Sequence, residues 1–405
     1  MNTIAEEYVK LVLAVGQHDE DYVDAYHGPE GWKKDAVREK KSLEQIERAA
    51  LKTRESLAAI KMPYDEKLAL RYKYLERQLA SLSARVALLK GERMSFDEES
   101  QALYDVVAPK FPEEHFQAIL NELDGLLPGS GSISDRYIAF KNHFIIQKDD
   151  LDVVFGTAIG ECRSRTKKHI RLPEQESFTV EYVNNKAWSG YNWFKGDCRS
   201  LIQVNTDLPI YIDRAVDLAA HEGYPGHHVY NSLLEHALLK ENGWVEFSVY
   251  ALFSPQSLIA EGTANYGIEV AFSKEERIDF ERDILFRLAK LHQDREAARY
   301  YKIHEVFSKL SYAGNEAARG YLDGAMTKAE AVDWLVQYAL MSKERAEQRI
   351  RFFDKYRSYV INYNVGQDMV KTYIEQTRNA GNDTQKRWHE FAELISSPRL
   401  PSQLV

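Results

Sequence analysis

Three histidines and a glutamate fall within the eight residues His221-Glu-Gly-Tyr-Pro-Gly-His-His228. In zinc hydrolases, two histidines about one helical turn apart and a third protein ligand hold the metal. The glutamate beside the first histidine is the general base for the metal-bound water. We therefore expect a Zn²⁺ site here, with His221 as a ligand and Glu222 as the catalytic base. The dipeptide His-Glu also occurs at 304–305 and 389–390, but no second histidine lies nearby, so both are interpreted as helix-surface pairs.

The spacing of these histidines does not fit a regular helix. Six or seven residues after His221, a straight helix has risen by about 9–10 Å, whereas two nitrogens on one zinc lie within about 4 Å of each other. Pro225 removes a backbone donor, and the glycines on either side of it relax the chain. We expect a bulge or kink that absorbs two residues and presents His227 as the second ligand. His228 is the alternative ligand, or else a catalytic group that supports the ligands or donates to the oxyanion.

The third ligand is expected from the segment that begins Leu258-Ile-Ala-Glu-Gly-Thr-Ala-Asn-Tyr266. Glu261 lies there among small and apolar residues, where an unpaired carboxylate would be costly to bury and a metal would neutralise it. The alternative interpretation of Glu261 is an acidic residue near a helix N-terminus after Ser254-Pro255. Glu269 is the alternative ligand.

Together, residues 221–228 and Glu261-Gly262 resemble the motif of a large bacterial family catalogued as a domain of unknown function. That motif is His-Glu-x-x-Pro-Gly-His-His, followed by a Glu-Gly helix. The resemblance covers residues 199–270, and the family is in turn similar to the gluzincin metallopeptidases of the thermostable-carboxypeptidase and angiotensin-converting-enzyme type. Aligning His227-His-Val-Tyr230 with the gluzincin His-x-x-Tyr also selects His227 as the ligand. The resemblance implies a two-lobed helical fold around a deep cleft and peptidase-like activity.

Near the C-terminus, the family pattern Pro-Gly-Gln-Ala-x-x-Tyr-x-x-Gly is retained only as Tyr363-Asn-Val-Gly366. Tyr363 is the candidate catalytic residue that polarises the substrate carbonyl, because a phenol can donate to an oxyanion. Tyr224 and Tyr266 are the alternative candidates for this role. The alternative interpretation of Tyr363 is a tyrosine that only packs in the core. An arginine that binds a substrate carboxylate would make a carboxypeptidase, whereas acidic residues near the metal would suit a free amino terminus. The arginine candidates are Arg319, Arg351 and Arg357.

The elements that must position these residues are mainly helical. Apolar residues recur at three- and four-residue spacing through 4–15, 43–57 and 68–89. Capping-box patterns at Ser95/Glu98 and Thr327/Glu330 indicate helix starts. Residues 177–183 and 199–205 alternate in polarity and contain β-branched residues, which predicts strands of a small antiparallel sheet within about 177–213. The segment Trp188-Ser-Gly-Tyr-Asn-Trp-Phe194 between them is expected to be an aromatic loop that either lines the cleft or fills a gap beside the sheet.

We expect a single catalytic domain over residues 1–405. Its N-terminal helical lobe spans 1–127. The lobe at 128–405 carries the sheet (about 177–213) and the metal site (221–261), and the run Pro128-Gly-Ser-Gly-Ser132 is the boundary or hinge between the two lobes.

Composition excludes several classes of partner. The net charge is −9 and no long basic stretch is present, which disfavours nucleic acid. No apolar run is long enough to cross a membrane, and acidic residues stand where a signal peptide would be basic, so no membrane association is expected. The two cysteines fit a reducing compartment, and a cytoplasmic location is expected.

The predicted function is that of a zinc-dependent metallohydrolase. We expect a metallopeptidase that cleaves small peptides by attack of zinc-bound water, assisted by Glu222. The alternatives are a catalytically inactive helical binding scaffold with a structural metal, and a zinc hydrolase of a non-peptide amide or ester. The intact Glu222 disfavours the scaffold, because a structural site does not need a base beside its ligand.

Overall fold

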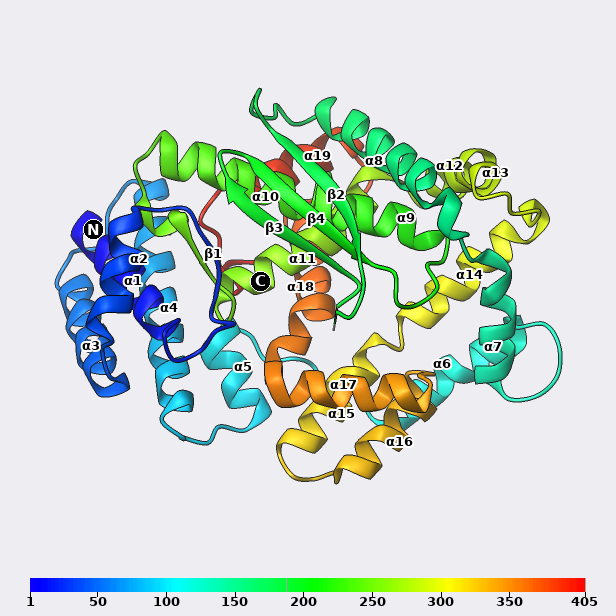
Figure 1. Cartoon of the computed structure of the whole chain (residues 1–405), viewed down its shortest axis with the longest axis horizontal. Coiled ribbons are helices and arrows are strands. Elements are labelled where there is room, and N and C mark those ends of the chain that lie inside the picture. Colours follow the sequence, from blue (N-terminus) through cyan, green and yellow to red (C-terminus); the bar gives the residue numbers. More distant parts are fainter. Residues whose placement is uncertain (187, 405) are drawn as a thin grey trace.

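Helices form most of the chain in the computed structural model of the protein, which describes residues 1–186 and 188–404. The predicted mainly α-helical class with a small sheet is confirmed. The first elements gather on one side of the molecule, drawn in blue and cyan in Figure 1. They are α1 (Asn2–Val15), β1 (Val23–Tyr26), α2 (Glu30–Glu39), α3 (Leu43–Ala58), α4 (Glu66–Leu89) and α5 (Phe96–Tyr104).

The middle of the chain contains the sheet and the motif helices. After α6 (Glu113–Leu126) and α7 (Ile133–Lys141) come α8 (Leu151–Lys167), β2 (Ser177–Val183), β3 (Gly190–Gly196), β4 (Arg199–Asn205), α9 (Asp213–Leu218), α10 (His227–Leu234), β5 (Val249–Ala251) and α11 (Pro255–Ala271). The C-terminal helices are α12 (Lys274–Phe280), α13 (Phe286–Leu288), α14 (Ala297–Ser308), α15 (Ser311–Leu322), α16 (Lys328–Tyr338), α17 (Lys343–Tyr356), α18 (Ile361–Thr372) and α19 (Thr384–Ile395).

Two helix starts match their predicted capping boxes. The Ser95 and Thr327 side chains accept from the backbone amides of Glu98 and Glu330, whose carboxylates bind back. The stripe from Ile4 to Val15 forms α1, and its apolar positions are buried. The predicted lobes, 1–127 and 128–405, stay a prediction, as does the gluzincin-like arrangement. No helix among the described residues combines the length and the apolar character needed to cross a bilayer.

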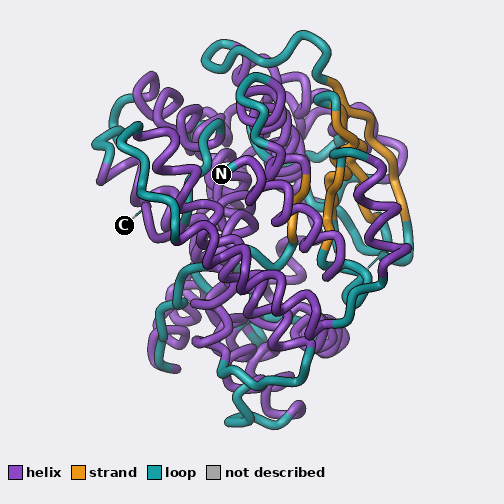
Figure 2. The backbone as a smooth tube through the Cα atoms, turned by 90° about the vertical axis from the view of Figure 1, so that its left-hand side faces the viewer, coloured by secondary structure: helices purple, strands orange, loops and turns teal. Residues whose placement is uncertain are grey.

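The strands lie together at one side of the molecule (Figure 2). The three-stranded sheet has the order β2-β4-β3, in which β2 runs parallel and β3 antiparallel to the central strand β4. Both predicted strands are observed, with the predicted bounds. They pair in parallel with each other, so the sheet is mixed and not wholly antiparallel as predicted. The expected aromatic loop is wrong in part, because Gly190–Gly196 forms β3. Aromatic residues fit a half-buried strand, and pairing with β4 decides the outcome.

α11 runs through the middle of the molecule and is buried along most of its length (Figure 1). All its residues from Pro255 to Ala264 are buried, among them Glu261. α18 packs along it, and the motif segment between α9 and α10 also contacts it. A polar side chain on a helix buried on all sides needs a partner or a ligand, because leaving it unpaired costs several kcal/mol, roughly 2–7 for a neutral group.

Candidate metal centre

The helix that carries His221 changes its winding at the motif. α9 continues as one π-helical turn, Ala219–Gly223, and the chain then leaves the helix before α10 begins at His227. A Cβ at Gly226 would lie 1.9 Å from the carbonyl oxygen of His221, so only glycine fits there. The expected break in the helix is therefore present.

This break brings His227 beside His221, and α11 brings Glu261 to both. The Nε2 atoms of His221 and His227 are 3.1 Å apart. Oε2 of Glu261 lies 3.4 Å from Nε2 of His221 and 3.7 Å from Nε2 of His227. Three donors on one tetrahedral zinc, each about 2.0–2.2 Å from it, lie roughly 3.3–3.6 Å apart. The structure therefore brings the three predicted ligands together at a spacing that fits zinc.

Oε2 of Glu261 is buried and has no hydrogen-bond partner among the described residues. Burial raises the pKa of Glu261, but the two neighbouring histidines hold it well below its usual range. Burial alone would lower the pKa of His227, because it disfavours the charged imidazole. The carboxylate of Glu261 more than offsets burial, and the pKa of His227 is raised to about 9. Such a site favours positive charge, and a divalent cation would supply that charge together with a partner for the free oxygen.

Two side chains, Asn265 and Tyr359, orient the candidate ligands through hydrogen bonds to the ligand atoms that face away from the cluster. Nδ1 of His221 lies 2.9 Å from Oδ1 of Asn265, whose amide nitrogen donates to the carbonyl of Tyr363. Nδ1 therefore carries the proton, and the lone pair on Nε2 faces the cluster. Tyr359 donates to Oε1 of Glu261 at 2.9 Å. Neither role was predicted from the sequence, although Asn265 follows Glu261 by one helical turn and Tyr359 precedes Tyr363 by one turn.

Glu222 is buried, 5% exposed, beside the first ligand. Its carbonyl accepts a hydrogen bond from Asn192 of β3 at 2.7 Å, and a Cβ on Gly190 of the same strand would lie 3.0 Å from its Oε1. Strand β3 thus fixes the backbone of Glu222 and leaves room for its side chain. None of the described side chains donates to its carboxylate, which is therefore available to accept a proton.

Tyr363 lies on α18 within electrostatic range of the cluster. Burial raises its pKa, and the charges of Glu261 and Glu222 raise it further. Its phenol is therefore a proton donor at neutral pH. The ring packs edge-on against that of Tyr359, with centroids 5.8 Å apart. The structure places the predicted carbonyl-polarising residue near the cluster.

The alternative candidates are engaged elsewhere. Tyr266 donates to Glu375 at 3.0 Å, and Glu269 pairs with Lys371 at 2.6 Å. Tyr266 could take the role of Tyr363 only by losing its hydrogen bond, and Glu269 could take the role of Glu261 only by losing its ion pair.

Two of the three candidate arginines are neutralised by carboxylates. Arg319 pairs with Asp97 at 3.0 Å, and Arg357 pairs with Glu99. Arg351 is exposed. None of the three is a guanidinium held free and buried beside the cluster.

His228 faces away from the cluster and is 1% exposed. Its Nδ1 lies 2.9 Å from Oγ of Ser200 and its Nε2 lies 3.1 Å from Glu176, which Arg163 and Tyr224 also bind. Both ring nitrogens are engaged, so the predicted catalytic role of His228 is corrected to that of a positioning residue that anchors the start of α10. The same contacts exclude it as the metal ligand. No local pattern in the sequence pointed to its partner, Glu176, far earlier in the chain.

A carboxylate from β1 also approaches the cluster. Burial raises the pKa of Asp24 to about 6, and the hydrogen bond that Tyr191 donates to it lowers the pKa. The charges of His227, Glu261 and Glu222 act on Asp24 as well, which places it within electrostatic range of all three. Tyr191 therefore belongs to the surroundings of the site. Asp24 was missed because nothing near it in the sequence resembles the motif.

A second group of potential ligands, Asp213, Asp217 and His304, is already neutralised. Arg277 pairs with Asp217 at 2.8 Å, and His304 lies 3.2 Å from Asp213. We interpret this group as an ionic network that ties α9 to α12 and α14.

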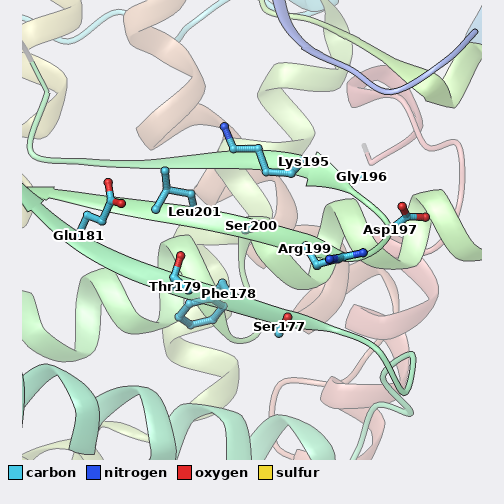
Figure 3. A pocket seen from close by; sticks show the side chains of 10 residues that line it. All are labelled: Ser177, Phe178, Thr179, Glu181, Lys195, Gly196, Asp197, Arg199, Ser200 and Leu201. Carbon is cyan, nitrogen blue, oxygen red and sulfur yellow. The ribbon is translucent and has the colours of Figure 1, made fainter. Parts of the chain in front are cut away.

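A depression of about 480 Å³ lies on the outer face of the three-stranded sheet (Figure 3). Residues of β2, β3 and β4 line it, including the exposed side chains of Glu181, Lys195 and Arg199. None of the cluster residues lines it. Phe178, on its floor, packs against the ring of His228 with centroids 5.1 Å apart. The depression is therefore separate from the candidate metal cluster.

Comparison with known proteins gives the fold alone. No family model and no curated protein matches the chain. The fold is similar to that of a chain described as a "putative lipoprotein" from Colwellia psychrerythraea, with a TM-score of 0.53 and 14% identity over 92% of this chain and 68% of that chain. A chain described as a "putative lipoprotein of unknown function" from Shewanella oneidensis gives a TM-score of 0.48 and 15% identity, over 92% of this chain and 74% of that chain. Function must be argued from the site itself.

Proposed function

We propose that this protein is a zinc-dependent hydrolase that cleaves small peptides. The observation that carries the proposal is the convergence of Nε2 of His221, Nε2 of His227 and Oε2 of Glu261 to within 3.1–3.7 Å of one another. Glu222 stands beside the first ligand with an unengaged carboxylate, which a purely structural metal site would not require. The resemblance of residues 221–228 and Glu261 to the gluzincin motif supports a peptide as the substrate.

The chain supplies each role that amide hydrolysis needs. His221, His227 and Glu261 would hold the ion, which when bound polarises a carbonyl and lowers the pKa of water toward about 7. Glu222 accepts a proton from water as the water oxygen bonds to the carbonyl carbon. It then delivers a proton to the nitrogen as the C–N bond breaks, so that one water adds across the amide. Tyr363 donates a hydrogen bond to the carbonyl oxygen as negative charge develops there.

The cysteines support this chemistry and a cytoplasmic location. Cys162 and Cys198 are free and buried. Burial raises the pKa of the two thiols to about 12 and about 11. Neither is an ionised nucleophile at neutral pH, and unpaired thiols are typical of a reducing compartment.

The test uses the full chain, purified without chelators. We expect elemental analysis to give one zinc per chain and a mixed peptide library to be turned over. Glu222→Gln should retain the zinc and lose at least about 100-fold in rate, the usual scale of general acid–base catalysis. The matched control is Glu305→Gln, which alters the exposed glutamate of another His-Glu pair and should change neither property.

A zinc-loaded protein that turns over no peptide would contradict the proposal, and so would turnover that survives Glu222→Gln. Either result would favour a structural metal in a helical scaffold.

A further inference from the structure

Arg349, on α17, is a guanidinium without a carboxylate. It forms no ion pair with any of the described residues, and its Nε is buried without a hydrogen-bond partner. Its guanidinium stacks on Phe352 and Phe353, at 4.6 and 5.5 Å from the ring centroids. By contrast, buried Arg71 binds both oxygens of Glu246. Burial lowers the pKa of Arg349 because the charge is held away from water, and Tyr363 offsets that cost only in part.

This guanidinium lies within electrostatic range of Tyr363, the tyrosine near the candidate metal cluster. α17 leads through a short turn into α18, and the two helices adjoin below α11 in Figure 1. The charge of Arg349 acts on Tyr363, and the charges of Glu261 and Glu222 act on the same hydroxyl. Tyr359, one turn before Tyr363, donates to Glu261. The phenol of Tyr363 is thus within electrostatic range of both the free guanidinium and the metal cluster.

Resting on the proposed hydrolase function, we propose that Arg349 binds the free α-carboxylate of a peptide substrate, which would make the protein a carboxypeptidase. A guanidinium and a carboxylate match in shape and form two parallel charged hydrogen bonds. In an extended peptide the α-carboxylate follows the last peptide carbonyl by one residue, about 3.3–3.6 Å along the chain. One bound peptide would then present its last carbonyl to the cluster and its carboxylate to Arg349.

A substrate bound with its free amino terminus at Arg349 fits the site less well. A free amino terminus would be repelled by Arg349, and the nearby carboxylate of Asp24 already accepts a hydrogen bond from Tyr191. The substrate class is therefore peptides with a free C-terminal carboxylate.

Binding is tested first, because it does not require turnover. Zinc-loaded Glu222→Gln protein is titrated by calorimetry with a set of N-acetylated dipeptides, each as the free acid and as the C-terminal amide. We expect the acids to bind at least about 30-fold more tightly than the amides, the scale of a buried charge pair. Arg349→Gln in the same background should abolish the difference, and Arg349→Lys should retain part of it. Arg345→Gln, an exposed position one turn away on α17, is the matched control and should keep the full difference.

Turnover by the zinc-loaded wild type is measured on the same peptide pairs. We expect kcat/KM to favour the acids at least about 30-fold, with single residues released from the C-terminus in mass spectra. Arg349→Gln should lower kcat/KM for the acids by a similar factor, mainly through KM, and leave the amides nearly unchanged. Its zinc content and thermal unfolding should match the wild type.

Acids and amides that bind equally would overturn the inference, as would a preference that survives Arg349→Gln or is lost in Arg345→Gln. If turnover depends on Glu222 but ignores C-terminal amidation, the inference fails while the proposed hydrolase stands. If the zinc-loaded protein discriminates acids from amides but turns over neither, the arginine site stands and the hydrolase fails.

Discussion

Gly262 of α11 and Gly366 of α18 pack backbone against backbone. A Cβ on Gly262 would lie 2.4 Å from the carbonyl carbon of Gly366, and a Cβ on Gly366 would lie 2.7 Å from the carbonyl oxygen of Leu258. No side chain fits between the helices at this point, so their separation is fixed. Glu261 precedes one glycine and Tyr363 lies one turn before the other. The crossing therefore sets the distance between a metal ligand and the tyrosine expected to bind the carbonyl oxygen.

Gly262→Ala should force this crossing apart. We expect the free energy of unfolding to fall by about 1–3 kcal/mol, the usual cost of overpacking, and zinc affinity to fall with it because Glu261 moves. Urea unfolding and zinc titration measure the two effects. Gly314→Ala on α15 is the control, because a Cβ there meets no atom within 4 Å. It should be neutral or stabilise by up to about 1 kcal/mol, and equal losses in both variants would contradict the steric interpretation.

Asn265→Ala should weaken zinc binding without removing a ligand. The Nδ1 proton of His221 loses its acceptor, so the ring is no longer held with Nε2 toward the cluster. Losses of about 10–100-fold are typical for such outer contacts. Competition with a chromophoric chelator measures the affinity, and Asn121→Ala, on the exposed face of α6, is the control. An unchanged affinity in Asn265→Ala would show that this contact does not orient the ligand.

Substitution of the two adjacent histidines should have different consequences. His227→Ala should abolish stoichiometric zinc, because it deletes a ligand. His228→Ala should keep the zinc and lose about 1–3 kcal/mol of stability, because buried Glu176 loses a partner. Elemental analysis and chemical unfolding of both variants make the comparison. The reverse pattern would reassign the ligand.

Asp24 should make the metal-free protein less stable as the pH rises. Its folded pKa of about 6 exceeds its ordinary value of 3.8, so the protonated form favours folding. That contribution is fully present below about pH 3.8 and is lost as the pH rises through about 6. In chelator-treated protein, Asp24→Asn should therefore gain stability relative to wild type between pH 5 and pH 7.5, by up to about 3 kcal/mol. A stability difference that is constant with pH, or larger at pH 5, would contradict this.

Local chemistry was enough to predict much of the site. Pro225 with its flanking glycines predicted the break in the helix, and the break brings His227 beside His221 despite their spacing in the sequence. Glu261 was found because a carboxylate among small apolar residues needs a reason to be buried. Several of the helices followed from apolar periodicity and capping residues, and two of the strands followed from alternating polarity and β-branched residues.

What could not be predicted depends on contacts between distant segments. His228 looked catalytic until its burial against Glu176 and Ser200 was seen, and neither partner lies near it in the sequence. Asp24 comes within electrostatic range of the cluster only because the fold brings β1 to this side of it. Arg349 was not among the arginines singled out from the sequence, since only tertiary packing decides which arginines lack a carboxylate.

Anomalous diffraction from crystals of the zinc-loaded protein, measured on both sides of the zinc absorption edge, tests the metal centre most directly. We predict one strong peak per chain, about 2.0–2.2 Å from Nε2 of His221, Nε2 of His227 and a carboxylate oxygen of Glu261. A peak bound instead to His228 and Glu176, or no peak at the cluster in protein that carries one zinc per chain, would contradict it.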